Sequence, residues 1–103
     1  MRASMSYGQQ WRSRKLMQFT THRVFERQTK KLKKKLRDQM WERLALLEID
    51  ESNPLLNNHK LGPPYESYRS INITGNYRLV YKRISANTYY LRAVGTHHQL
   101  YGT

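Results

Sequence analysis

Residues 68–96 read YRSINITGNYRLVYKRISANTYYLRAVGT, and this stretch decides the fold. It holds three runs rich in β-branched and aromatic residues, a composition that is typical of strands. The runs cover residues 68–73, 77–84 and 88–94. They are separated by two short segments of turn-forming residues, Thr74-Gly75-Asn76 and Ser85-Ala86-Asn87. The stretch therefore predicts an antiparallel three-stranded meander.

The first run has two different sides. Ile71 and Ile73 alternate with Ser70 and Asn72, and alternate residues of a strand point to opposite faces of a sheet. An antiparallel sheet packs its apolar face against a core and can leave the other face to solvent. We therefore expect helices on one face of this sheet and a second face that is free for a ligand.

The helical part of the chain lies upstream, between Val24 and Ile49. Apolar residues recur there at intervals of mostly three or four, the period of one helix face. They are Phe25, Leu32, Leu36, Met40, Leu44 and Leu47. No Gly or Pro interrupts the segment, so it is either one long helix or two helices joined near residues 33–35. It ends before Pro54, which has no N–H and keeps Asn53 out of helical backbone angles.

The remaining segments complete an α+β architecture. Residues 17–22 are compatible with a short opening strand, and residues 50–67, which hold all three prolines, predict an irregular connection. After the meander, residues 95–103 form a short C-terminal tail. Residues 1–16 are basic and polar and predict a flexible extension, so the compact domain spans residues 17–103.

The charge is strongly positive and unevenly distributed. The chain has 19 Lys and Arg against 7 Asp and Glu, a formal net charge of +12 that attracts polyanions such as nucleic acid. From Ser67 onward there are five basic residues and no acidic one. Arg69 and Arg78 belong to the same predicted sheet as the start of the tail, so we expect a cationic concave face.

Several function classes are disfavoured by what the sequence lacks. It has no Cys, which excludes a disulfide framework, a Cys-based zinc site and a thiol nucleophile. It has no Gly-rich phosphate loop, no zinc-protease motif and no serine-hydrolase motif, and we expect neither a metal nor a cofactor. The longest purely apolar run, residues 44–47, is far shorter than the ~20 residues of a membrane span. No secretory signal is evident, and a cytoplasmic protein is expected.

Three motifs carry a resemblance to a known family. They are Asn58-His59-Lys60-Leu61, Tyr77-Arg78-Leu79-Val80-Tyr81, and Gly95-Thr96-His97 followed by Tyr101-Gly102. Together with the order of the segments, they resemble the RelE/ParE superfamily of type II toxin–antitoxin toxins, and the ending is most similar to its YafQ-like branch. The resemblance covers residues 17–103. It implies the RelE-like fold and a ribosome-dependent endoribonuclease that cleaves mRNA and is neutralised by a cognate antitoxin.

Cleavage of RNA without a metal requires a base, an acid and cations. The base deprotonates the 2′-hydroxyl, the acid protonates the departing 5′-oxygen, and histidine suits both roles because its unperturbed pKa of about 6.5 lies near working pH. The resemblance implies His97 as general acid and His59 as general base, with the order of roles open. It implies Arg78 as a phosphate ligand and Tyr101 as a base-stacking or proton-donating group.

Other basic residues are expected to bind the RNA backbone. They are Arg69, Lys60, Lys82, Lys33 and Lys34. The chain also departs from the YafQ-like pattern, because it has Ser70 and Asn72 where some members carry an acid and a further His, and this leaves fewer titrating groups. Each expected site residue also has an ordinary structural interpretation, such as a strand cap for His97 or a tail anchor for Tyr101.

Two further functions fit the same sequence. A ParE-like gyrase poison would keep the fold and need no catalytic histidine. A non-enzymatic RNA-binding protein would need only the positive charge, through release of counterions from phosphates. The ending Gly95-Thr96-His97 favours the nuclease over the gyrase poison, which has no use for it. Growth separates the RNA-binding protein from a toxin, because cells should tolerate the former when it is expressed without a partner.

Overall fold

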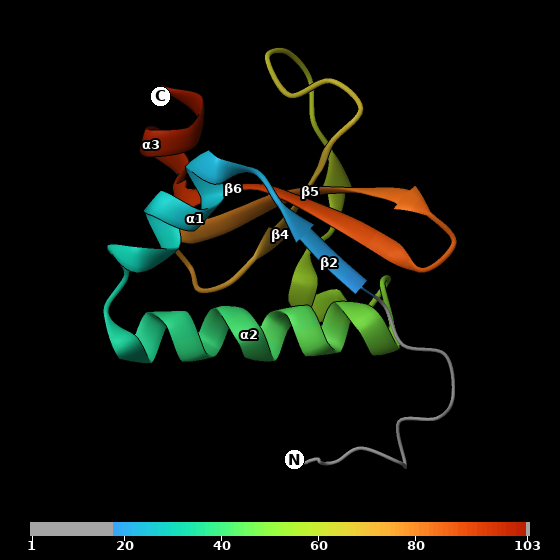
Figure 1. Ribbon diagram of the computed structural model, residues 1–103, viewed down its shortest axis with the longest axis horizontal. Helices are drawn as coiled ribbons and strands as arrows, with labels where there is room; N and C mark the ends of the chain where they lie inside the picture. Colours follow the sequence, from blue (N-terminus) through green and yellow to red (C-terminus); the bar gives the residue numbers. More distant parts are fainter. Residues whose placement is uncertain (1–17, 103) are drawn as a thin grey trace.

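The computed structural model describes residues 18–102, along which five strands and four helical segments follow one another (Figure 1). The strands are β2 (Gln18–Thr21), β3 (His59–Lys60), β4 (Arg69–Asn72), β5 (Tyr77–Ser85) and β6 (Thr88–Thr96). The helices are α1 (Arg23–Lys30), α2 (Lys34–Ile49), the 3₁₀-helix η2 (Pro54–Leu56) and α3 (His97–Tyr101). The expected N-terminal extension, residues 1–16, lies outside the described residues.

All five strands form one sheet, in the order β2-β6-β5-β4-β3. β4, β5 and β6 make the antiparallel meander that the sequence predicts. The opening strand β2 pairs in parallel with β6 at one edge. At the other edge β3 adds two residues, inside the segment 50–67 that we expected to be irregular. The α+β architecture is thus confirmed, with one strand more than predicted.

The helical segment consists of two helices rather than one. Residues 31–33 interrupt it, and Lys33 has the extended backbone angles (φ −64°, ψ 151°) of a residue that precedes a helix. α1 begins after His22, whose Nδ1 accepts the backbone N–H of Val24 at 3.0 Å. Desolvation and neighbouring arginines lower the pKa of His22, which favours the neutral ring that can accept this bond.

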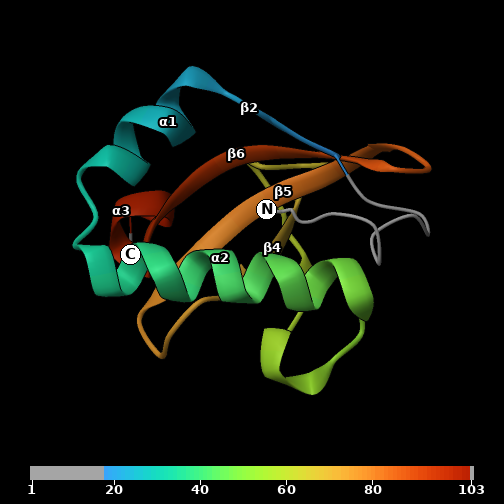
Figure 2. The same ribbon diagram turned by 60° about the horizontal axis from the view of Figure 1, so that its bottom comes forward.

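Both helices pack against the same face of the sheet, which we call the helix face. α2 runs along the sheet (Figure 2), and its apolar residues join those of α1 and the strands in one core cluster. On the strands this face presents Ile71, Leu79, Tyr81 and Leu91, all of which are buried. The predicted helix positions Phe25, Met40, Leu44 and Leu47 are buried in the same cluster, and Leu32 and Leu36 pack against it. None of the helices within residues 18–102 is long and apolar enough to cross a bilayer.

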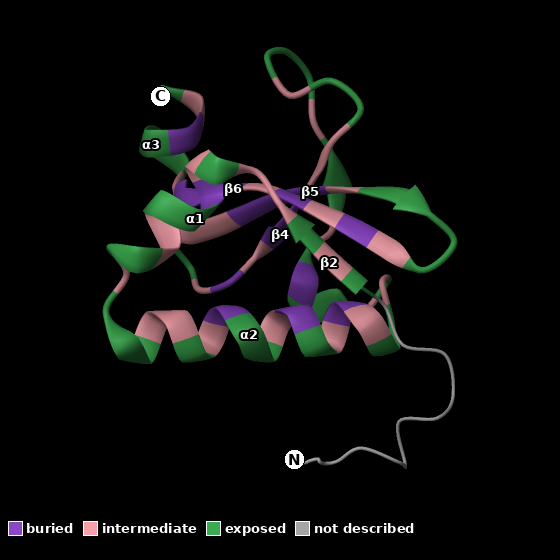
Figure 3. Ribbon diagram, in the orientation of Figure 1, coloured by how far each residue is buried: buried purple, intermediate pink, exposed green. Residues whose placement is uncertain are grey.

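The opposite face, which we call the site face, carries a second and smaller cluster. Val80 and Ala93 form its floor, and Leu100 of α3 packs on them. Four partly buried residues lie against it, namely Leu61, Tyr65, Tyr68 and Tyr101. The expectation of a free second face is therefore wrong for the part under α3 and the segment 61–68. Most residues of α3 and of that segment are themselves exposed (Figure 3).

The C-terminal tail forms the short helix α3, which sequence reasoning did not predict. A capping box starts it, because Thr96 Oγ1 accepts the Gln99 N–H at 3.1 Å and Gln99 Oε1 accepts the Thr96 N–H at 2.8 Å. Gly102, at φ 75°, ends it in the left-handed conformation that favours glycine. Gly95 permits the close return of the chain, since a Cβ there would lie 2.8 Å from Gln99 Oε1.

Candidate active site

Strand register gathers several expected residues on the site face. His59 lies opposite Ser70, and Arg78 lies opposite Asn72. Ser70 also lies opposite Val80, a floor residue of the smaller cluster. Residues opposite each other share a face, as does every second residue along a strand. The first four side chains therefore project on the same face as Val80.

The helix α3 brings two more expected residues to this face. The rings of His97 and Tyr101 are one helical turn apart and meet edge to face, with centroids separated by 4.7 Å. The Tyr101 hydroxyl donates to Ser70 Oγ at 3.3 Å. Ser70 is also the register partner of His59. Ser70 therefore connects Tyr101 of α3 with His59 of the edge strand β3. We call this group the candidate site: His59, Ser70, Asn72, Arg78, His97 and Tyr101.

His59 is exposed, and its tautomer is defined by a hydrogen bond. Its Nδ1 lies 2.8 Å from the backbone oxygen of Asn57. A carbonyl oxygen only accepts, so Nδ1 carries the hydrogen and Nε2 of the neutral ring carries the lone pair. Asn57 ends η2 in the left-handed conformation (φ 46°, ψ 47°), which turns its carbonyl toward the ring. His59 thus offers a proton acceptor, Nε2, on an exposed side chain.

Arg78 supplies positive charge at the end of the site face and also stabilises the β4–β5 hairpin. Its Nη1 donates to the backbone oxygens of Thr74 and Gly75, both at 3.1 Å, and of Tyr77 at 3.2 Å. The carbonyl oxygens hold the guanidinium close to the hairpin turn. A substitution of Arg78 therefore changes both the charge of the site and the turn beside it.

Asn72 contributes an acceptor that has no partner. Its Oδ1 is buried and makes no hydrogen bond with any residue of the described range 18–102. Buried polar atoms in native proteins are nearly always paired, so such an atom calls for an explanation. Sequence reasoning did not name Ser70 or Asn72 as site residues. The signal that finds them is the pairing of β4 with β5, which assigns both to the face of Arg78.

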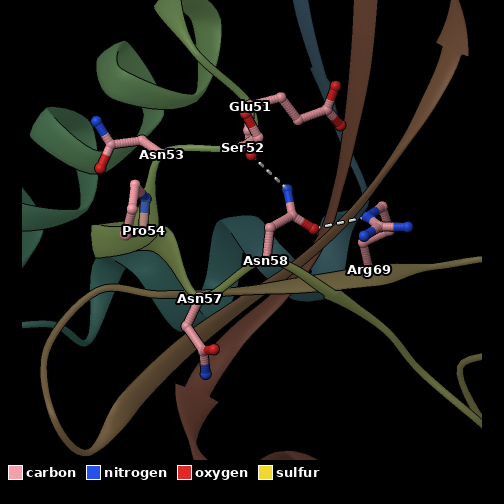
Figure 4. Close-up of a pocket in the computed structure, with 7 residues that line it drawn as sticks. All are labelled: Glu51, Ser52, Asn53, Pro54, Asn57, Asn58 and Arg69. Atoms are coloured by element: carbon pink, nitrogen blue, oxygen red, sulfur yellow. Dashed lines mark hydrogen bonds between the residues drawn. The ribbon is translucent and has the colours of Figure 1, made fainter.

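Arg69 lies on the other face, which corrects the expectation that both arginines line one cationic surface. It is opposite Tyr81, a core residue of the helix face. Arg69 belongs to a pocket of about 680 Å³ lined by seven residues (Figure 4). The lining residues are Glu51, Ser52, Asn53, Pro54, Asn57, Asn58 and Arg69. The register thus separates Arg69 from the candidate site by the thickness of the sheet.

A hydrogen-bonded network in this pocket fixes the side chain of Asn58. Arg69 Nε donates to Asn58 Oδ1 at 2.6 Å, and Asn58 Nδ2 donates to the Tyr81 hydroxyl at 2.7 Å and to the backbone oxygen of Glu51 at 3.2 Å. The Tyr81 hydroxyl donates in turn to Glu51 Oε2 at 2.7 Å, and Glu51 Oε1 accepts from Arg83 at 3.2 Å. Burial, and next the hydrogen bond to Glu51, raises the pKa of Tyr81.

The expected RNA-binding lysines are divided between the two faces. Lys82 lies two residues beyond Val80 on β5, and its Nζ lies 4.8 Å from the centre of the Tyr68 ring, beside the smaller cluster. Lys60 is the register partner of Arg69 and so belongs to the helix face. Lys33 and Lys34 lie at the start of α2, where Lys34 pairs with Asp38 at 2.8 Å. Among Lys60 and Lys82, the two expected lysines in strands, only Lys82 therefore lies on the site face.

Nowhere between residues 18 and 102 do three or more His, Asp or Glu side chains gather as metal ligands would. The candidate site instead combines two exposed imidazoles, a guanidinium, two hydroxyls and an amide. This set can accept and donate protons and can neutralise an anion. Which of these groups acts on a substrate stays a prediction.

Comparison with known proteins identifies the fold. No protein-family model matches the chain, and no curated protein sequence matches it. Among solved structures, YafQ from E. coli superposes with a TM-score of 0.70 at 18% identity, over 84% of this chain and 99% of YafQ. A chain of the E. coli DinJ–YafQ toxin–antitoxin complex gives 0.68 at 18% identity, over 84% and 98%. The YoeB–YefM toxin–antitoxin complex from Staphylococcus aureus gives 0.66 at 20%, over 79% and 97%. The chain has the RelE-like fold of these toxins.

Proposed function

We propose that this protein is the toxin of a type II toxin–antitoxin system and that it cleaves mRNA on the ribosome. The fold shared with YafQ and YoeB supports the toxin role. The observation that carries the nuclease role is the contact of Tyr101 with Ser70, because it links the helix of His97 to the strand neighbour of His59. Two proton-transfer groups and a cation then share one face of the sheet.

The proposed reaction needs no metal. His59 Nε2 takes the proton of the ribose 2′-hydroxyl, and the 2′-oxygen forms a bond to the adjacent phosphorus. The bond from phosphorus to the 5′-oxygen breaks, and protonated His97 donates its proton to that oxygen. The products are a 2′,3′-cyclic phosphate and a free 5′-hydroxyl. The His59 tautomer supports this order of roles, since its Nδ1 already donates to Asn57 and Nε2 is the acceptor.

The remaining groups bind and orient. Arg78 neutralises the charge that develops on the phosphorane oxygens, a role that its guanidinium suits. Tyr101 holds the His97 ring through their edge-to-face contact and is a positioning residue in this proposal. Lys82 contacts the backbone of the message.

The test is cleavage of mRNA in a translating-ribosome extract by wild type, His97→Ala and His98→Ala. His98 is the matched control, because it is the next residue of the same helix and is also exposed. We expect His97→Ala to slow cleavage by about 10²- to 10⁴-fold and His98→Ala to leave it unchanged. Equal cleavage by all three proteins would reject the catalytic assignment.

The proposed partner is an acidic antitoxin. A groove of about 510 Å³ lies beside the start of α2, with Leu32, Leu36 and Tyr77 along it and Lys31, Lys33 and Lys35 among its lining residues. Within residues 18–102 none of these three lysines makes a salt bridge. Their charge suits an acidic segment with an apolar anchor, which is what a partner of a +12 chain would offer.

Expression tests the partner and separates the alternatives. A toxin arrests growth when it is expressed alone, and co-expression of the small protein encoded by the neighbouring gene restores growth. Arrest with intact mRNA and gyrase-linked DNA breaks would instead identify a gyrase poison. Growth without arrest would favour the remaining alternative, a non-enzymatic RNA-binding protein.

A further inference from the structure

We propose that Arg69 is a positioning residue for His59, acting through Asn58 from the opposite face of the sheet, and that it does not contact RNA. This inference rests on the proposed function for its catalytic consequence, although its structural part can be tested without RNA. The device consists of Glu51, Asn58, Arg69 and Tyr81, and we call it the Asn58 clamp.

The clamp holds the Asn58 amide at three points. Its Nδ2 donates to Tyr81 and to the backbone of Glu51, and its Oδ1 accepts from Arg69 at 2.6 Å. The partners also fix which way the amide faces. An arginine only donates, so an amide turned by 180° would place its own donors against those of Arg69. Arg69 therefore selects one orientation of Asn58.

Holding Asn58 fixes the group that orients His59. The oxygen that accepts from His59 Nδ1 belongs to the peptide unit joining Asn57 to Asn58. That peptide unit is planar, so an anchored Asn58 fixes the direction of the Asn57 carbonyl. The carbonyl in turn keeps the hydrogen on Nδ1 and the lone pair on Nε2, the nitrogen that the proposed reaction uses. A path of covalent and hydrogen bonds thus runs from Arg69 to the base.

The local structure gives His59 little other support. β3 has only two residues, is paired on one side only, and lies at the edge of the sheet. Short edge strands of this kind are weak on their own and open easily. His59 itself is exposed. The position of its ring therefore depends on the clamp beneath it rather than on packing around it.

The first measurement uses the protein without RNA. The ¹⁵N chemical shifts of the His59 ring report which nitrogen carries the hydrogen, and we expect the Nδ1–H tautomer in wild type. Arg69→Met removes the donor while keeping the length of the side chain, and it should produce a mixture of both tautomers. Tyr81→Phe keeps the buried ring but removes the hydroxyl that accepts from Asn58 Nδ2. This variant should give the same mixture of tautomers.

Arg43→Met is the matched control. The Arg43 guanidinium also donates to the segment 50–67, to the backbone oxygen of Leu55 at 3.2 Å, and Arg43 is not among the hydrogen-bond partners of the Asn58 side chain. We expect this variant to keep the wild-type His59 tautomer. Thermal melting of each variant shows that the fold is retained. A wild-type tautomer in both folded clamp variants would overturn the proposal.

Kinetics supply the second measurement. Arg69→Met should lower kcat by up to about 100-fold, the cost of a misplaced catalytic group, with KM unchanged. In a His59→Gln background the same substitution should cause no further loss. An increase in KM with kcat and the tautomer unchanged would make Arg69 an RNA ligand and overturn the proposal. If wild type cleaves no RNA, the proposed function fails while the tautomer measurement still decides the role of Arg69.

Discussion

Arg69 and Arg78 come from adjacent strands of one sheet, yet their surroundings are different. Arg69 lies opposite a buried tyrosine on the helix face and donates to a side-chain amide in a polar pocket. Arg78 lies opposite Asn72 on the site face and donates to the backbone of a hairpin. Strand register, and not residue type, therefore decides which basic residues can contact a substrate on the site face.

The same contrast holds for the two faces as a whole. The helix face carries the main core, with residues from α1 and α2, whereas the apolar cluster of the site face has three buried residues, one of them Leu100 of the five-residue helix α3. A small cluster can position a tail helix without contributing most of the stability. Substitutions on the two faces test this division of roles and the contrast between the two arginines.

The largest effect is expected on the helix face. Leu79 is fully buried in the main core, so Leu79→Ala should lower the free energy of unfolding by about 2–5 kcal/mol. Urea denaturation measures this loss. A loss below 1 kcal/mol would mean that the main core does not support the sheet in the way its burial indicates.

A smaller loss of stability is expected on the site face. Leu100 is 6% exposed and anchors α3 on Val80 and Ala93. Leu100→Ala should cost about 2 kcal/mol, at the low end for such substitutions, and should release α3 while the sheet stays folded. Hydrogen exchange of the α3 amides should quicken far more than that of β5. Equal acceleration in both elements would contradict the separation of the two faces.

The two arginines should differ in their contribution to RNA binding. In a cleavage-inactive His97→Ala background, Arg78→Gln should flatten the plot of log affinity against log salt by about 0.7, the value for one phosphate contact of a single strand. Arg69→Gln should leave the slope unchanged. Filter binding at several salt concentrations measures both slopes. A flatter slope for Arg69→Gln with an unchanged slope for Arg78→Gln would make Arg69, and not Arg78, the RNA contact.

The smallest effect is a dependence of stability on alkaline pH. The pKa of Tyr81 is higher in the folded protein than in the unfolded chain, mainly because the ring is buried. The unfolded chain therefore loses this proton first, and the contribution of Tyr81 is complete below about pH 10 and declines above it. Denaturation of wild type and Tyr81→Phe from pH 8 to 11 measures the free energy of unfolding of each protein. We expect this free energy to fall less with rising pH in the variant than in wild type. Parallel declines would show that Tyr81 titrates as in an unfolded chain.

Local patterns predicted much of the fold. The meander follows from the alternation around Ile71 and Ile73, and the helices follow from the three-to-four spacing of residues such as Met40 and Leu44. The sequence does not decide between one helix and two, because no Gly or Pro marks the break near Lys33. α3 was missed because five residues carry too short a pattern, and its formation depends on a capping box.

The candidate site was harder to predict than the fold. His59, Arg78, His97 and Tyr101 were chosen by resemblance, and the structure brings them to one face. The position of Arg69 could not be predicted, since it depends on the register of β4 with β5. The Asn58 clamp joins residues up to 30 positions apart in the chain, as the bond between Tyr81 and Glu51 illustrates, and no local pattern encodes such contacts.

The central claim is that His97 and His59 share one face as acid and base, and a modified message tests it directly. Sulfur in place of the 5′-oxygen at the cleaved bond gives a leaving group that departs without a proton. We expect this substrate to restore wild-type cleavage to His97→Ala and to leave His59→Gln as slow as before. If the modified message restored cleavage only to His59→Gln, His59 would be the acid and His97 the base. If it restored cleavage to neither variant, neither histidine would be the acid, which would contradict the claim.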